Sequence, residues 1–346
     1  MPPPSPPHTI HPSRSLSETT SLWYPLIHTL GWNRSLADGP MHYHAALDGS
    51  TWLLVSLQAP NPDTYPLGTS DPQYKADTKT ASSPQGCILA LPYPNGTGWI
   101  GFFLMNEAQR GRGMGGTLWR GMDAVWEREG VTTIGLDGVE EQVPTYTRRG
   151  FVDVGRIPLM MCSAARVAKF SAGGSVGEEK AVPEGRFVDA RKVDREVIRR
   201  LDERLTGLDR QRYWVTSDLW DREGVFGFAY FSPSSSSELS GFVLVRACDE
   251  GHRIGPLFAP DPAVAIHLLK IVMQHPSITA SWSSGSLIAE AFGANAMAKD
   301  VFEELGWEYA GVEYHRMWYQ GRVPEPQQEG GLGTKCMFAV FDAACG

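Results

Sequence analysis

One short run of residues has the types and spacing needed to hold a phosphate group. It reads Gln109-Arg110-Gly111-Arg112-Gly113-Met114-Gly115-Gly116, with two arginines and four glycines. Glycines leave successive backbone N–H groups unobstructed, and such groups at the start of a helix bind phosphate oxygens because the helix dipole is positive there. The sequence therefore predicts a phosphate-binding turn at residues 110–116.

The segments on either side of this turn would have to position it. Residues 99–105, Trp-Ile-Gly-Phe-Phe-Leu-Met, are typical of a buried strand. After the turn, apolar residues recur at helical spacing on one face: Leu118, Met122, Val125 and Trp126. Some twenty residues further on comes Tyr146-x-x-x-Gly150-Phe151. The predicted order is strand, turn, helix, strand and then this Tyr-x-x-x-Gly-Phe element.

Three other interpretations of the glycines were considered. Gly111-x-Gly113-x-x-Gly116 also satisfies the dinucleotide fingerprint, with Asp137 where the ribose-binding acid would stand. Five polar or small residues, 106–110, separate the strand from the turn and argue against that fold. No Gly-Lys-Ser/Thr follows, which excludes a Walker-type loop. A glycine-rich surface turn without a ligand stays open as the plain alternative.

Composition limits the class of protein. The 346 residues are enough for two domains, and the net charge of −8 argues against nonspecific nucleic-acid binding. Five scattered cysteines without C-x-x-C spacing indicate no disulfide framework and no metal site, so we expect a cytoplasmic protein. No apolar run reaches membrane-spanning length, and we expect no membrane partner. Residues 1–14 are Pro-rich and are predicted to be a disordered tail.

The chain contains an internal repeat. Three landmarks recur in the same order at offsets of 154 to 156 residues: 86–91 with 241–246, 100–101 with 254–255, and 146–151 with 302–307. Three matches in register predict two copies of one α/β module. A polar, Gly-rich stretch at 171–180 suits a linker. We therefore expect an N-terminal module at 15–165, a linker at 166–183 and a C-terminal module at 184–346.

These motifs together resemble the GNAT acetyltransferase superfamily, and in particular a bacterial and fungal subgroup with two fused modules. The family's acetyl-CoA loop, Arg/Gln-x-x-Gly-x-Gly/Ala, is matched by Arg110, Gly113 and Gly115. The subgroup's marks are Gly31-Trp32-Asn33, Gly135-Leu136-Asp137-Gly138-Val139, Arg253-Ile254-Gly255-Pro256-Leu257 and Arg316-Met317. The resemblance runs from about Trp23 to the C-terminus. It implies an α/β (α+β) fold in which each module is a mixed, mostly antiparallel twisted sheet flanked by helices.

The resemblance also implies roles for individual residues. The activity would be transfer of an acetyl group from acetyl-CoA to a primary amine. The cofactor's diphosphate would lie on the turn, and its pantetheine arm would pair with the strand before it: Leu104, Met105, Arg110, Gly111, Arg112, Gly113, Met114, Gly115 and Gly116. Tyr146 falls where the family places the general acid. Candidate bases are Asp137, Glu140 and Glu141, with Glu107 at the end of the preceding strand, and Trp32 and Asn33 would wall the acceptor pocket.

The second copy keeps the scaffold and loses the site. Its counterpart of the glycine turn is Ala259-Pro260-Asp261-Pro262-Ala263, in which prolines remove N–H donors and the carboxylate repels phosphate. Phe302 replaces Tyr146 and has no proton to donate. We therefore expect a degenerate C-terminal module, one active site, a small-molecule amine acceptor and a monomer. The alternatives are a non-catalytic acyl-CoA-binding or interaction protein and a dinucleotide-binding oxidoreductase.

Overall fold

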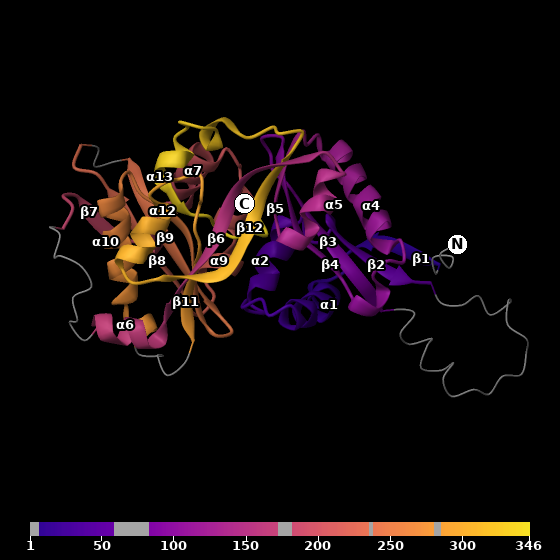
Figure 1. Cartoon of the computed structure of the whole chain (residues 1–346), viewed down its shortest axis with the longest axis horizontal. Coiled ribbons are helices and arrows are strands. Elements are labelled where there is room, and N and C mark those ends of the chain that lie inside the picture. Colours follow the sequence, from indigo (N-terminus) through magenta and orange to yellow (C-terminus); the bar gives the residue numbers. More distant parts are fainter. Residues whose placement is uncertain (1–6, 59–82, 172–181, 235–237, 280–284) are drawn as a thin grey trace, which may run out of the picture.

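One continuous β-sheet runs through both halves of the molecule. The computed structural model describes residues 7–58, 83–171, 182–234, 238–279 and 285–346. Within these ranges thirteen strands form one sheet in the order β1-β2-β3-β4-β5-β12-β6-β11-β10-β9-β8-β7, and β13 pairs with β10 beside this path. The mixed α/β fold is confirmed, but the two expected sheets are joined into one (Figure 1).

The first half supplies one edge of this sheet and the helices next to it. Its strands are β1 (His8–Pro12), β2 (Trp52–Leu57), β3 (Pro84–Pro92), β4 (Thr97–Met105), β5 (Thr133–Gly138) and β6 (Phe151–Ser163). Its helices are α1 (Leu16–Thr29), α2 (Asp38–Ala45), α4 (Met114–Glu129), α5 (Val143–Thr147) and α6 (Ala164–Ser171), with short 3-10 turns η2 (Glu107–Gln109) and η3 (Glu140–Gln142).

The second half repeats this order of elements. Its strands are β7 (Arg186–Asp189), β8 (Val225–Phe231), β9 (Leu239–Cys248), β10 (Gly251–Phe258), β11 (Ser286–Glu290), β12 (Glu308–Tyr319) and β13 (Met337–Ala339). Its helices are α7 (Arg195–Thr206), α8 (Gln211–Val215), α9 (Ser217–Trp220), α10 (Pro262–Met273), α11 (Pro276–Thr279), α12 (Ala298–Glu304) and α13 (Gly333–Cys336), with η4 (Ala190–Lys192) and η5 (Glu325–Gln327). The two halves thus correspond element by element. The antiparallel strands β2, β3 and β4 correspond to β8, β9 and β10, and the elements α4, β5, α5 and β6 that follow them correspond to α10, β11, α12 and β12.

The two halves exchange their long sixth strands. β5 pairs antiparallel with β12 of the second half, from Gly138↔His315 to Gly135↔Trp318. β6 pairs instead with β11 and, along most of its length, with β12. The strand that ends each half therefore completes the sheet of the other half. The predicted boundaries at 165 and 184 divide the sequence, but they do not divide the sheet.

The faces of the sheet carry different cores, as the alternation along β2 shows. Leu53 and Val55 pack with α4, whereas Trp52 and Leu54 belong to a large core shared with α1, α2, α7 and α8. Alternate residues of a strand point to opposite faces, so α4 covers one face of the sheet and the shared core covers the other. In the second half α10 and α12 pack with a third cluster. The shared core is therefore the interface at which the two halves meet.

Two predictions about irregular segments are corrected by the structure. Residues 8–12, expected in a disordered tail, form β1 and pair with β2 from His8↔Leu57 to Pro12↔Leu53. Their order comes from this long-range pairing, which composition does not reveal. The predicted linker begins inside α6, where Val167 and Phe170 are buried against the core of the second half. Residues 172–181 lie outside the described residues.

Candidate active site

The predicted phosphate-binding turn connects β4 to α4 with its backbone N–H groups open. Gly111 and Gly113 have φ values of +74° and +81°, a conformation that glycine adopts without strain. Gly113 is the N-cap of α4 and no side chain caps it. No described residue accepts a hydrogen bond from the N–H groups of residues 111–115, whereas Gly116 and Thr117 donate to the Gly113 carbonyl. These free donors at a helix N-terminus form an anion site.

A slot opens beside this turn because β4 and β5 separate. Their parallel pairing ends at Ile100↔Leu136, although β4 continues to Met105 and β5 to Gly138. The other edge of β4 stays paired with β3, since Cys87 still opposes Leu104 beyond a register shift. The β4 edge that faces the slot therefore has no strand partner beyond Ile100, although the Met105 carbonyl accepts from Arg110 Nε at 3.4 Å, and an extended ligand could pair with this edge as an added strand does.

Tyr146 lies against the splayed end of β5. A Cβ on Gly138 would stand 2.8 Å from its ring, and the ring packs with Trp119 and Phe151 at centroid distances of 6.1 and 6.4 Å. Burial raises the pKa of Tyr146 to about 12, and the charge of nearby Arg149 opposes this shift. The phenol is therefore neutral at physiological pH and has a proton to donate.

The first candidate base, Asp137, is committed to an ion pair. Arg316 on β12 donates from Nε and Nη2 to its two carboxylate oxygens at 2.9 and 2.7 Å, and neither side chain is more than 4% exposed. Burial raises the pKa of the Asp137 carboxyl, while Arg316 lowers it. The partner lies 179 residues away in the sequence, so no local spacing points to it. Asp137 fixes the exchanged strand at the mouth of the slot.

The other candidate bases are placed differently. Glu140 has a side chain that is 77% exposed, and its Oε2 lies 2.5 Å from Nε2 of the buried His315. The other ring nitrogen of His315 lies 2.7 Å from Asp153 Oδ2. Sequence reasoning missed this His315–Asp153 pair because β12 and β6 become neighbours only through the strand exchange. The carboxylates of Glu141 and Glu107 are exposed and have no bond to a described residue.

Trp32 and Asn33 do not face a described cavity. Asn33 donates to the carbonyl of Glu250 and accepts from its N–H at 2.9 and 3.0 Å, which ties α1 to the β9–β10 turn. Trp32 is partly buried against the shared core. These contacts pack the two halves together, and a role for Trp32 and Asn33 in the acceptor pocket stays a prediction.

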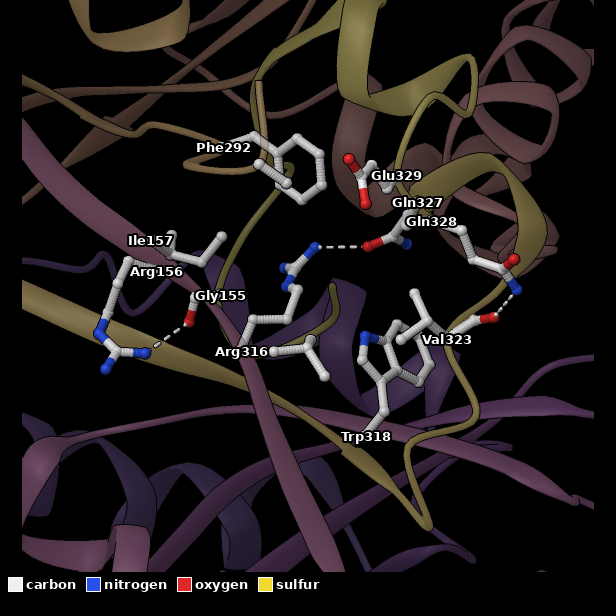
Figure 2. Close-up of a pocket in the computed structure, with 12 residues that line it drawn as sticks. Gly155, Arg156, Ile157, Phe292, Arg316, Trp318, Val323, Gln327, Gln328 and Glu329 are labelled. Atoms are coloured by element: carbon white, nitrogen blue, oxygen red, sulfur yellow. Dashed lines mark hydrogen bonds between the residues drawn. The ribbon is translucent and has the colours of Figure 1, made fainter. Parts of the chain in front are cut away.

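A cavity of about 230 Å³ lies on the shared-core face of the exchanged strands (Figure 2). Its inner end is formed by Ile157, Phe292, Arg316 and Trp318, all of them buried. Its outer end is lined by the exposed Val154, Gln328 and Glu329. Arg316 lines the cavity and also binds Asp137, which lies on β5.

The second half has neither feature of the phosphate site. Asp261 caps α10 by accepting from the N–H of Val264 at 2.9 Å, so its own carboxylate satisfies this helix start. β10 and β11 also separate after Ile254↔Ala289, but β13 enters the gap. Leu257↔Ala339 and Phe258↔Met337 pair there, and Ala291 bridges to Ala339. β13 thus fills the second cleft.

Two general searches complete the description of the site. Among the described residues, no group of three or more His, Cys, Asp and Glu side chains could hold a metal ion. Each helix in the described ranges is too short or too polar to cross a bilayer.

Sequence comparison connects the chain to acyltransferases. The profile described as "Acetyltransferase (GNAT) domain" matches residues 198–329, in the second half. Holothin acyltransferase of Pseudoalteromonas sp. (strain SANK 73390) is 27% identical over 247 residues, which cover 71% of this chain and 74% of that protein.

Structural comparison matches the whole fold. A proposed acetyltransferase from Pyrococcus horikoshii superposes with a TM-score of 0.64 at 18% identity, over 98% of this chain and 96% of its own. A tandem GNAT protein from the clavulanic acid biosynthesis pathway superposes with a TM-score of 0.57 at 12% identity, over 90% and 98%. The second half therefore matches a GNAT acetyltransferase domain, the sequence is similar to that of an acyltransferase, and the whole chain has the fold of tandem GNAT proteins.

Proposed function

We propose that this protein is an acetyl-CoA-dependent N-acetyltransferase that modifies a primary amine of a small molecule at one active site, in the N-terminal half. The observation that carries the proposal is the combination of free N–H groups at residues 111–115 with the slot that opens after Ile100↔Leu136. The turn would hold the diphosphate of the donor, and the unpaired edge of β4 up to Leu104 and Met105 would hold its pantetheine arm. Arg110 and Arg112 are exposed beside the turn and add positive charge.

The reaction needs three proton movements around one bond exchange: the ammonium loses one proton before attack, the nitrogen loses a second as the amide forms, and the departing sulfur gains one. An ammonium loses a proton to a base, and the free amine forms a C–N bond at the thioester carbonyl while the C–S bond breaks. The sulfur leaves with the bonding electron pair and takes a proton. Tyr146 is the acid that the geometry favours, since it is neutral and packs against Gly138 at the end of β5.

For the base, Glu140 and Glu141 are the stronger candidates. Asp137 is bound through both oxygens to Arg316 and buried, so proton uptake there would break a buried ion pair. Glu140 has one oxygen fixed by His315 and a largely exposed side chain, and Glu141 is exposed and unpaired with any described residue.

The second half supports the reaction without binding a donor. Asp261 takes the place of an anion at the start of α10, and β13 takes the place of an extended arm beside β10. The similarity to holothin acyltransferase, a protein named for a small-molecule substrate, supports an acceptor of that size.

The test is a measurement of free-thiol release from acetyl-CoA with a panel of small amines, together with calorimetric titration of the protein with acetyl-CoA and with NAD. We expect acetyl-CoA to bind with 1:1 stoichiometry, at least one amine to release thiol, and NAD not to bind. Binding without transfer to any amine would favour a non-catalytic acyl-CoA-binding protein. Binding of two molecules of acetyl-CoA per protein would contradict the proposal that the second half binds no donor.

A further inference from the structure

We infer that the cavity beside Arg316 is the acceptor pocket, and that it selects small amines with a flat apolar body and a carbonyl or carboxylate oxygen next to the amine. This inference rests on the proposed function and adds the class of acceptor. It depends on the donors and rings that meet at the inner end of the cavity (Figure 2).

Two buried side chains at that end have hydrogen-bond donors to spare. Arg316 carries five N–H groups. It uses two on Asp137 and one, at 3.0 Å, on Gln327 Oε1, which leaves two without an acceptor among the described residues. Trp318 is fully buried, and its indole Nε1–H has no hydrogen-bond partner among the described residues. A spare donor on a residue that lines a cavity can bind an acceptor atom of a ligand, and that bond would offset the free-energy cost of leaving the donor unpaired.

Gln327 does not supply that acceptor atom. Its Oε1 accepts from Arg316, and its Nε2 donates to the carbonyl of Thr206 at 2.6 Å, so the amide is fully oriented. Asp137 is likewise saturated by Arg316. The spare donors are therefore left for an oxygen of a ligand. A carbonyl and a carboxylate both offer an oxygen that accepts these hydrogen bonds, and they differ in charge.

The rest of the inner end is apolar and flat. Phe292 and Trp318 present aromatic rings and Ile157 adds an aliphatic wall. The Arg316 guanidinium lies over the ring of Trp99 at 4.9 Å and over that of Phe292 at 5.4 Å, so its orientation is fixed by stacking on both sides. A planar, apolar body suits these walls better than a flexible polyamine chain does.

Size and position set the remaining limits. A volume of about 230 Å³ is below the roughly 300–1,000 Å³ of drug-sized pockets, so the acceptor is small. The inner end is linked to β5, since Arg316 binds Asp137, the residue that follows the last β4–β5 pair, Ile100↔Leu136. The oxygen that binds Arg316 and the amine that reacts must therefore sit close together in the same molecule.

The test compares matched acceptors with wild-type protein and two tryptophan variants. The acceptors are phenylalaninamide, phenylalanine, phenethylamine without the oxygen, and glycinamide without the ring. Trp318→Phe removes the spare indole donor and keeps an aromatic ring. Trp307→Phe is the control, because Trp307 is also buried with an unpartnered Nε1 but belongs to the core of the second half.

We expect phenylalaninamide or phenylalanine to have a lower KM than phenethylamine and glycinamide. The KM values of phenylalaninamide and phenylalanine, compared with each other, show whether the pocket prefers a neutral carbonyl or a charged carboxylate. Trp318→Phe should raise the KM of the preferred acceptor about tenfold, the factor that one hydrogen bond provides, and leave the KM values of phenethylamine and acetyl-CoA unchanged. Trp307→Phe should change none of them.

The inference fails if Trp318→Phe raises the KM of phenethylamine as much as that of phenylalaninamide, or if it behaves as Trp307→Phe does. Calorimetric binding of the same amines keeps this test separate from the proposed function. Binding that is weakened only by Trp318→Phe supports the pocket even if no thiol is released, a result that would count against the proposed transfer reaction. Absence of both binding and turnover for all four amines overturns the pocket.

Discussion

A pair of substitutions at the two ends of α4 tests the proposed donor site most directly. Gly113 precedes the helix and Gly130 follows it, with φ values of +81° and +68°. Any other residue in this left-handed region costs about 1–2 kcal/mol. Gly113→Glu and Gly130→Glu therefore carry the same added charge and similar backbone strain. We expect only Gly113→Glu to abolish acetyl-CoA binding.

The size of the effect follows from the turn. A glutamate at 113 is drawn to the free N–H groups of residues 111–115, and loss of two charge-assisted bonds to the diphosphate costs about 3–6 kcal/mol. Repulsion adds about 0.8 kcal/mol per pair of unit charges at roughly 5 Å in water. The dissociation constant should therefore rise by about 10³-fold or more.

Gly130→Glu, the control variant, should destabilise α4 more than Gly113→Glu does. A carboxylate is favourable near a helix N-terminus and unfavourable near its C-terminus, by about 0.3–1 kcal/mol. If general destabilisation caused the loss of binding, Gly130→Glu would show that loss at least as strongly. Thermal unfolding of both variants checks that they fold.

Calorimetric titration gives the result. Gly113→Glu should lose acetyl-CoA but keep whatever weak affinity the wild type has for S-acetylpantetheine, which lacks the diphosphate. Gly130→Glu should bind acetyl-CoA as the wild type does. Binding by Gly113→Glu within tenfold of the wild type would refute the placement of the diphosphate on this turn.

Four further substitutions address the chemistry. Tyr146→Phe should lower kcat about 10²-fold and leave the KM for acetyl-CoA unchanged. Because burial raises the pKa of Tyr146 to about 12, the phenol stays protonated, and the loss of kcat should be equal at pH 7 and pH 9. A loss of kcat at only one of these pH values would contradict an acid role. Initial rates of thiol release should be compared for Glu140→Gln and Glu141→Gln. Replacement of the base should lower the rate at least about 10²-fold, whereas replacement of a surface carboxylate should change it little. Near-normal rates for both variants would exclude both residues as the base. Asp137→Asn should lower the free energy of unfolding in urea by about 3–5 kcal/mol, because it leaves Arg316 buried without its counter-charge; a stable but inactive variant would instead make Asp137 the base.

The parts of the site that the sequence predicted are those set by local chain chemistry. The turn at 110–116 needs glycines with positive φ and a helix start, and both are encoded within eight residues. The self-capped start of α10 is encoded as locally by Asp261 and the prolines that flank it. Tyr146 is the fourth residue of the five-residue helix α5 and is followed closely by Gly150 and by Phe151 at the start of β6, so this element is also local.

The parts that the sequence could not predict depend on which strands become neighbours. β6 and β12 have the same alternation whether each pairs within its own half or crosses to the other, so the exchange leaves no periodicity of its own. The partners Arg316 of Asp137 and His315 of Glu140 follow from that exchange. β1 is similar, since its order comes from β2, more than forty residues away.

The exchange also explains what a half without a donor site contributes. β13 fills the cleft between β10 and β11, and the chain then runs on into the shared core. There the carbonyl of Ala343 accepts from Trp99 Nε1 at 2.9 Å, and the carbonyl of Ala344 lies where a Cβ on Gly101 would be. Gly101 is the first residue of β4 beyond its pairing with β5. The same segment that closes the second cleft therefore forms a wall of the first one, opposite α4, while β12 brings Arg316 to its mouth. Under the proposed function the second half would contribute walls to the acceptor side of the site, so changes in β12 or in the C-terminal segment should alter acceptor choice before they alter donor binding.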